Sequence, residues 1–172
     1  MSRSNRSNRV DRSLPAGKKQ VLSSPTQNEL HDLARQRQLA LDAARMGWWT
    51  YDPATKIATW DDRYKEIFEV AGHSRPNEEI LKRLHPDDLP GVWKKVEAAL
   101  DPADPKPYSA EYRICMTDGR IKWIEAHGLA TFEGDGPCRR ATMFVGTVTD
   151  ISERKRTEED IRQKDDRYRR IV

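Results

Sequence analysis

Three consecutive extended segments constrain the fold most strongly. Residues 108–116 alternate apolar and polar side chains, which predicts a strand with one buried face. Asp118-Gly119 follows, and this dipeptide is typical of a tight hairpin turn. Residues 120–132 and 139–151 carry apolar side chains on both faces. We therefore expect an antiparallel sheet that other elements cover on each side.

A helix and a short aromatic hairpin are predicted before this sheet. Thr26 and Glu29 fit a capping box, so we expect a helix to begin there and to end at Gly47. Residues 48–51 and 56–60 then read as two strands joined by a turn. The hairpin and the three later segments together give five strands.

The central segment, residues 61–101, is predicted to be helical throughout and shows no strand pattern. Residues 89–100 form its clearest helical face. Asp87 and Asp88 lie at the start of that helix, so we interpret them as capping residues rather than as a pair of catalytic carboxylates. We expect these helices to cover one face of the sheet, and the first helix or a partner subunit to cover the other.

Composition limits the size of the core. Apolar residues make up 36% and charged residues 34% of 172 residues, which predicts one modest domain with exposed helices and tails. Residues 1–25 carry six basic side chains, one acidic one and few large apolar ones, so we expect a disordered basic tail. A tail for nucleic acid or an anionic membrane, or a transit peptide, is the alternative, but the segment lacks aromatic residues and an amphipathic face.

No membrane span, secretory signal or metal site is expected. The chain contains no run of 18 apolar residues and no apolar segment near its start. Cys115 and Cys138 lack metal-ligand spacing, which favours reduced thiols in a cytoplasmic protein. None of the four histidines pairs with another ligand at metal-binding spacing. Phosphate-binding loops and nucleophile motifs are also missing, so the sequence predicts no catalytic machinery of its own.

The order of helix, two strands, short helices, three strands and a charged exit helix resembles a PAS domain, a sensor module of bacterial signalling proteins. The resemblance covers roughly residues 40–155. The motifs that carry it are Gly47-Trp48-Trp49, Trp60-Asp61, Leu84-His85-Pro86-Asp87-Asp88, Glu111-Tyr112-Arg113, Asp118-Gly119, and the closing PAC-type segment Gly146-Thr147-Val148-Thr149-Asp150-Ile151-Ser152. Ser152 stands where the family usually has threonine, which keeps the hydroxyl group.

The resemblance implies an α+β PAS fold: a five-stranded antiparallel sheet with short helices on one face, an N-terminal flanking helix and a C-terminal signalling helix. The expected parts are a tail (1–25), a flanking helix (26–46), a PAS domain (47–151) and a linker or signalling helix (152–172). The last residues resemble the entry into a second PAS domain. A longer protein is implied, with an output domain in cis from a sensor histidine kinase of a two-component system, or else from a diguanylate cyclase or phosphodiesterase.

The resemblance also bears on cofactors. Haem-binding members carry a histidine in the third helix, and residues 89–100 contain none. The flavin photoadduct branch needs a central cysteine, and no cysteine precedes Cys115. Haem and a covalent flavin photoadduct are therefore not expected, and the identity of any ligand stays open. Two functions remain: a sensor that binds a small ligand or partner, and a ligand-free dimerisation module.

Candidate residues follow for each role. A ligand pocket, or alternatively plain core packing, is expected from Trp60, Ile67, Phe68, Trp93, Tyr112, Ile114 and Met143. Coupling to the exit helix is expected from Asp150, as N-cap of a capping box, with Ser152 and Glu153. A homodimer interface is expected from Leu30, Leu33, Leu41, Ile121 and Trp123. Nucleic acid is not expected as a partner.

Overall fold

The computed structural model describes residues 26–169. The predicted tail (1–25) and the final residues of the predicted second-domain entry (170–172) lie outside this range. The described elements are α1 (Gln27–Ala43), β1 (Gly47–Asp52), β2 (Ile57–Trp60), α2 (Asp62–Phe68), β3 (Ser74–Pro76), α3 (Asn77–Leu81), α4 (Leu89–Leu100), β4 (Tyr108–Cys115), β5 (Ile121–Glu133), the 3₁₀ turn η1 (Gly136–Cys138), β6 (Arg140–Asp150) and α5 (Ser152–Arg169).

The sheet is antiparallel and its strands follow the order β3-β2-β1-β6-β5-β4. The predicted fold class is confirmed, but the sheet has six strands rather than five. The additional strand, β3, lies in the segment that was predicted to be helical throughout. Its three residues are too few to show an alternating pattern. At the other side of the sheet, Ile114 of β4 forms a bridge with Leu84.

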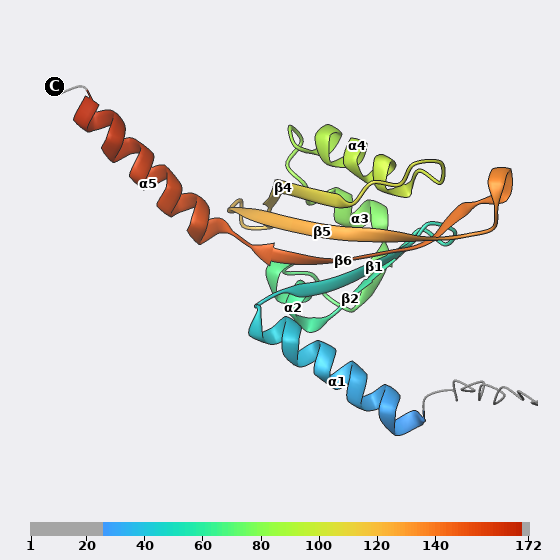
Figure 1. Ribbon diagram of the computed structural model, residues 1–172. Helices are drawn as coiled ribbons and strands as arrows, with labels where there is room; N and C mark the ends of the chain where they lie inside the picture. Colours follow the sequence, from blue (N-terminus) through green and yellow to red (C-terminus); the bar gives the residue numbers. More distant parts are fainter. Residues whose placement is uncertain (1–25, 170–172) are drawn as a thin grey trace, which may run out of the picture.

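The core lies between the inner face of the sheet and the short helices (Figure 1). Phe68 of α2 and three strand residues, Ile114, Ile124 and Val148, are its most completely buried large side chains. They come from three different strands and one helix, so the core ties the two layers together. This confirms the prediction that the central helices cover one face.

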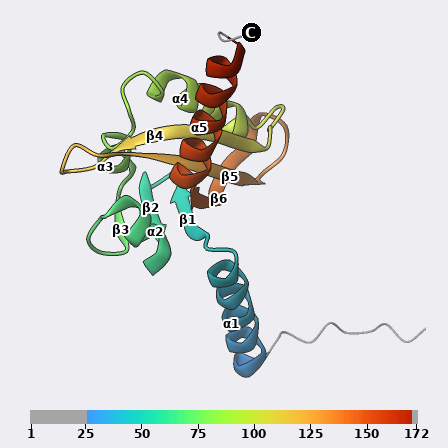
Figure 2. The ribbon, with the colours of Figure 1, turned by 90° about the vertical axis from the view of Figure 1, so that its left-hand side faces the viewer.

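The first helix does not cover the other face of the sheet. Figures 1 and 2 show α1 and α5 extending away from the sheet in different directions. Leu129 and Met143 on the outer face are 61% and 46% exposed. The first helix is therefore not the element that covers this face, because its main contact with the sheet is with β1.

The predicted start of α1 is confirmed. The Glu29 amide donates to Thr26 Oγ1 at 3.3 Å, and the Thr26 amide donates to the Glu29 carboxylate at 2.6 Å, which completes a capping box. No residue of α1 is buried, so this helix depends on its own caps and on local side-chain pairs rather than on packing.

Two glycines allow the layers to approach closely. A Cβ atom at Gly47 would lie 2.7 Å from the Tyr64 backbone, so glycine lets α2 pack directly against β1. A Cβ atom at Gly146 would overlap the Trp49 indole, so glycine lets this ring lie flat against β6. Both positions therefore shape the inner face on which the cavity described below is built.

Candidate functional site

A cavity of about 80 Å³ lies between the inner face of the sheet and the helices, and half of the residues that line it are aromatic. Trp60 stacks on Tyr64 at a centroid distance of 5.2 Å, and Tyr64 is in turn stacked on Phe68 behind it. Across the cavity, Phe144 meets Trp49 and Tyr108 edge to face at 4.9 and 5.5 Å. Apolar walls of this kind are typical of small-molecule sites.

Three buried tyrosines contribute hydroxyl groups to this space. Tyr64, Tyr108 and Tyr112 are all buried and all line the cavity. Burial raises the pKa of each phenol, and the neighbouring phenols raise those of Tyr64 and Tyr112 further. The three hydroxyls are therefore neutral at physiological pH and close to one another. Within residues 26–169 no hydrogen bond reaches any of them.

Other polar groups also line the cavity, among them the hydroxyl of Tyr51 and the indole groups of Trp60 and Trp93, whose N–H groups donate to the Gly72 carbonyl and to Glu97. The indole Nε1 of Trp49 is buried and lacks a hydrogen-bond partner among the described residues. Asn77 contributes the only amide side chain of the described wall. No acidic or basic side chain between residues 26 and 169 lines the cavity.

Six of the seven predicted pocket residues lie at the cavity wall or in the core behind it. Trp60, Tyr112 and Trp93 line the cavity, although Trp93 is 38% exposed and lies at the rim with its indole bonded to Glu97. Three others are buried in the core away from the cavity wall, namely Ile67, Phe68 and Ile114.

Met143 is wrong as a pocket residue, because Phe144 points inward and neighbouring strand residues point to opposite faces. The prediction also missed Trp49, Tyr64, Tyr108 and Phe144. The alternation of residues along β4 could have predicted Tyr108, because it lies on the same face of the strand as Tyr112.

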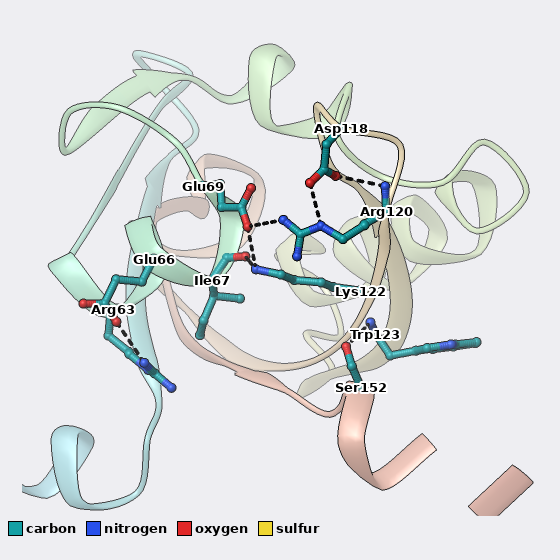
Figure 3. Close-up of polar contacts among 9 residues, drawn as sticks. All are labelled: Arg63, Glu66, Ile67, Glu69, Asp118, Arg120, Lys122, Trp123 and Ser152. Carbon is teal, nitrogen blue, oxygen red and sulfur yellow. Dashed lines mark hydrogen bonds and ion pairs between the residues drawn. The ribbon is translucent and has the colours of Figure 1, made fainter. Parts of the chain in front are cut away.

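A second set of contacts joins the sheet to α5. The Ile151 amide donates to the Trp123 carbonyl at 2.9 Å, and the Trp123 amide donates to Ser152 Oγ at 2.9 Å. Figure 3 shows Ser152 at the start of α5 beside the Trp123 amide. Ile151 is buried. The pairing between β5 and β6 therefore continues to the first residue of α5 without a gap.

Asp150 takes part in this junction in a different way from the one predicted. It is the last residue of β6, and its carboxylate accepts a hydrogen bond from the Ser152 amide at 2.9 Å. The predicted capping box with Glu153 is wrong, because α5 begins at Ser152 and Ile151 occupies the N-cap position. Ser152, through its hydroxyl, is the coupling candidate that contacts the sheet.

Ion pairs between β4 and α5 reinforce the junction. The Glu111 carboxylate forms ion pairs with the Lys155 ammonium at 2.5 Å and with the Arg154 guanidinium at 2.6 Å. The hydrogen bond from Lys155 is the main reason why the pKa of Glu111 lies below its ordinary value. Lys155 and Arg113 also lie over the Trp123 ring, at 5.1 and 5.6 Å from its centroid.

Asp88 occupies the N-cap position of α4, as the sequence predicts, but its side chain makes no capping hydrogen bond and belongs to the same network instead. Its carboxylate accepts from the Arg113 amide at 2.8 Å and from the Arg113 guanidinium at 2.6 and 2.9 Å. These hydrogen bonds lower the pKa of Asp88. Asp87 is exposed and lies 3.8 Å from the same guanidinium. Asp88 therefore ties the start of α4 to β4.

A third connection runs from α2 to β5. Lys122, next to Trp123, donates to the Ile67 carbonyl at 2.9 Å and pairs with Glu69 at 3.2 Å. Figure 3 shows Arg120 reaching the same carboxylate from the β4–β5 turn, where it also binds Asp118. The helix that carries Tyr64 is thus fastened to the strand that carries the α5 junction.

The predicted dimer residues lie in different surroundings. Leu30, Leu33 and Ile121 are exposed by 50–59%, whereas Leu41 is half-buried. Trp123 is half-buried beneath the two cations of the junction. The first three remain available for a partner, and Trp123 is already occupied by contacts within the chain.

Residues 26–169 contain no group of three or more His, Cys, Asp and Glu side chains able to hold a metal ion. No helix in that range is long and apolar enough to cross a membrane.

Comparisons with known proteins agree with this architecture. The family model described as "PAS fold" matches residues 57–145. A sensory box histidine kinase/response regulator from Burkholderia thailandensis has a similar solved structure, with a TM-score of 0.65 and 27% identity over 78% of this chain and 98% of that chain.

Two curated relatives are much longer than this chain. A blue-light-activated histidine kinase from Brucella anthropi is 26% identical over 160 residues, which are 90% of this chain and 30% of the relative. The probable diguanylate cyclase DgcE from Escherichia coli is 28% identical over 130 residues, which are 75% of this chain and 11% of the relative. The chain therefore spans less than a third of either protein.

Proposed function

The chain belongs to the PAS-fold family, and we propose that it is the sensory module of a longer signalling protein. In this proposal a small ligand enters the aromatic cavity, and its presence changes the exit helix α5. One observation carries the proposal: β4 faces both sites. Its inner face presents Tyr108 and Tyr112 to the cavity, and its outer face presents Glu111 and Arg113 to the α5 junction.

The relay that we propose uses the contacts on both sides of Trp123. A ligand that displaces Tyr112 moves the β4 backbone, and with it the carboxylate that holds Lys155. A ligand that displaces Tyr64 moves α2, which Lys122 fastens to the residue next to Trp123. Both movements reach the Trp123 amide and Ser152, where α5 begins. Packed elements of this kind pass small shifts onward because they respond as units.

The output domain that we propose is a histidine kinase in cis, which makes the parent a two-component sensor in the cytoplasm. The relatives named as histidine kinases favour this choice. Cys115 and Cys138 are both free thiols, which suits a reducing compartment. The alternative output is a diguanylate cyclase or phosphodiesterase, and the relative from Escherichia coli favours that choice.

Native mass spectrometry combined with hydrogen exchange tests the sensor proposal. We expect purified chain to carry a small molecule, and its removal under mild denaturing conditions to change amide exchange in residues 152–169. The control region is residues 27–43, which lie outside the proposed relay. An α5 that exchanges identically with and without the bound molecule would contradict the relay.

A ligand-free dimerisation module is the second candidate, because exposed leucines gather on α1. Leu30, Leu33 and Leu39 are each more than half exposed. Under this candidate the chain forms a homodimer through α1 and Ile121, and its purified form carries no ligand. Light scattering of the wild type and of Leu30→Ala/Leu33→Ala distinguishes the cases, since a monomer at high micromolar concentration in both would rule out this dimer.

A further inference from the structure

We infer that the cavity is built for an uncharged, planar ligand of a single small ring that accepts a hydrogen bond from the buried tyrosine hydroxyls. The inference rests on the proposed function, because it names the ligand class of the same cavity. It is carried by four properties of the site: its size, its flat aromatic walls, its lack of charge and its hydrogen-bond donors.

The size of the cavity limits the ligand. The space of about 80 Å³ is smaller than the cavities of about 300–1,000 Å³ that hold drug-sized ligands. It is also about half of the cavity of about 150 Å³ that is known to take benzene. Trp93 is partly exposed at the rim, so a ring can sit with one edge toward solvent. A fused-ring cofactor does not fit this space.

The walls favour a flat molecule. Trp60 and Phe68 cover the two faces of Tyr64, and Phe144 meets Trp49 and Tyr108 edge to face. A planar ring gains edge or face contacts with flat side chains of this kind. A branched aliphatic molecule of the same volume gains neither.

The absence of charged side chains along the described wall disfavours an ionic ligand. No basic side chain among residues 26–169 lines the cavity, so a buried carboxylate or phosphate would meet neutral donors there but no cation to balance its charge. A buried cation similarly needs an acidic partner, apart from what the ring faces supply. An uncharged molecule does not carry this desolvation cost.

The Trp49 indole supplies a buried hydrogen-bond donor at this cavity that has no partner among the described residues. Such buried donors are normally satisfied, so a ligand with an acceptor atom gains affinity here. Tyr64, Tyr108 and Tyr112 are buried residues that line the same space, and none of their hydroxyl oxygens is a fully buried atom without a partner. These neutral hydroxyls therefore border the open part of the cavity, where they can donate to the same acceptor.

The test uses the full 172-residue chain and three probes of matched shape. Pyrazine is a neutral ring with two acceptor atoms, benzene is the same shape without an acceptor, and N-methylpyridinium is a ring with a fixed positive charge. Dissociation constants come from two-dimensional NMR titrations, in which the indole N–H signal of Trp49 reports directly on the cavity. We expect pyrazine to bind at least about tenfold more tightly than benzene, since two or more donors gain a partner.

Single hydroxyl deletions then locate the donors. Tyr64→Phe, Tyr108→Phe and Tyr112→Phe keep the ring and remove one hydroxyl each, and at least one is expected to weaken pyrazine about two- to tenfold without changing benzene. Tyr168→Phe, on the exposed end of α5, is the matched control and should change neither. The NMR spectrum of each free variant establishes that it is folded.

Three results would overturn the inference: equal affinity for pyrazine and benzene, tightest binding of N-methylpyridinium, or no probe that shifts cavity signals. Hydrogen exchange of residues 152–169 at saturating pyrazine separates this inference from the sensor proposal. If pyrazine binds as expected but α5 does not respond, the ligand class stands and the relay fails. If no probe binds but a co-purified molecule changes α5, the relay stands and the ligand class fails.

Discussion

The two terminal helices are joined to the sheet in opposite ways. Between α1 and β1 the chain turns through Arg45, whose φ of 56° is left-handed, and the helix itself buries no residue. Between β6 and α5 it runs from Asp150 through buried Ile151 to Ser152, and hydrogen bonds with Trp123 hold both Ile151 and Ser152. α1 is therefore attached by its end, whereas α5 is an extension of the sheet.

The difference shows what a coupling element requires. A helix follows the movement of a strand only if hydrogen bonds and ion pairs hold its first turn to that strand. At α5, Ser152, Arg154 and Lys155 provide such contacts within one turn. At α1, the contact of Arg37 with the Trp48 ring at 4.8 Å is of the weaker, exposed kind. Variants at the two joints should therefore differ in their effects on the stability of the domain and on hydrogen exchange in the attached helix.

The largest effect is expected at the α1 joint itself, from Gly47→Ala. The new Cβ atom would lie 2.7 Å from the Tyr64 backbone, so α2 must move. Overpacking of this kind costs about 1–3 kcal/mol, and we expect the upper end because the neighbour is backbone. The thermal midpoint should fall by roughly 10 °C. Gly91→Ala, with no atom within 4 Å of the new Cβ, is the control and should leave the midpoint unchanged or raised.

Asp88→Asn should have the next largest effect on stability, because it weakens the contacts of Asp88 with Arg113 in the network that joins β4 to α5. Removing the charge weakens three hydrogen bonds with Arg113 and should lower the unfolding free energy by about 1–2 kcal/mol at pH 7. Because folding lowers the pKa of Asp88, this stability is present above its unfolded value of about 3.9 and is lost as the pH falls through the lowered value. Urea unfolding should show a difference that disappears near pH 2. A difference that persists there would mean that charge is not its source.

Asp150→Ala should act on α5 more than on the sheet. The Ser152 amide loses its acceptor, and a lost acceptor at a helix start costs about 0.5–2 kcal/mol. We expect faster hydrogen exchange in residues 152–160 and a thermal midpoint lowered by only a few degrees. Collapse of the whole domain would instead make Asp150 a general structural residue, and unchanged exchange would make it a simple surface residue.

The smallest effect on the stability of the domain is expected from Thr26→Ala, although this change, like Asp150→Ala, removes a hydrogen-bond acceptor at the start of a helix. The capping box of α1 is lost, so exchange in residues 27–33 should rise. The thermal midpoint of the domain should not change measurably, because α1 packs little against it. A clear drop in the midpoint would show that α1 is as firmly joined to the sheet as α5.

Local patterns predicted the fold well, but not the partners of individual polar residues. The long strands, the Thr26 capping box and the inward faces all depend on neighbours within a few positions, so they could be read from the sequence. Asp88 was correctly placed at the start of α4, but the partner of its side chain was not predicted because Arg113 lies 25 residues away. The cavity was only partly found, because alternation tells which residues face inward but not which of them border an empty space. β3 was missed because it is so short.

The two outermost strands of the sheet have a consequence for self-association. β3 is three residues long and ends in Pro76, which has no amide hydrogen to offer a neighbour. The free side of β4 is occupied near its end by hydrogen bonds with Arg83 and His85, and near its start by the Lys95 ammonium on the Ser109 carbonyl. Both margins thus resist the addition of a strand from another molecule. Association of copies through β3 or β4 is therefore disfavoured, which limits strand-to-strand aggregation at the two outermost strands.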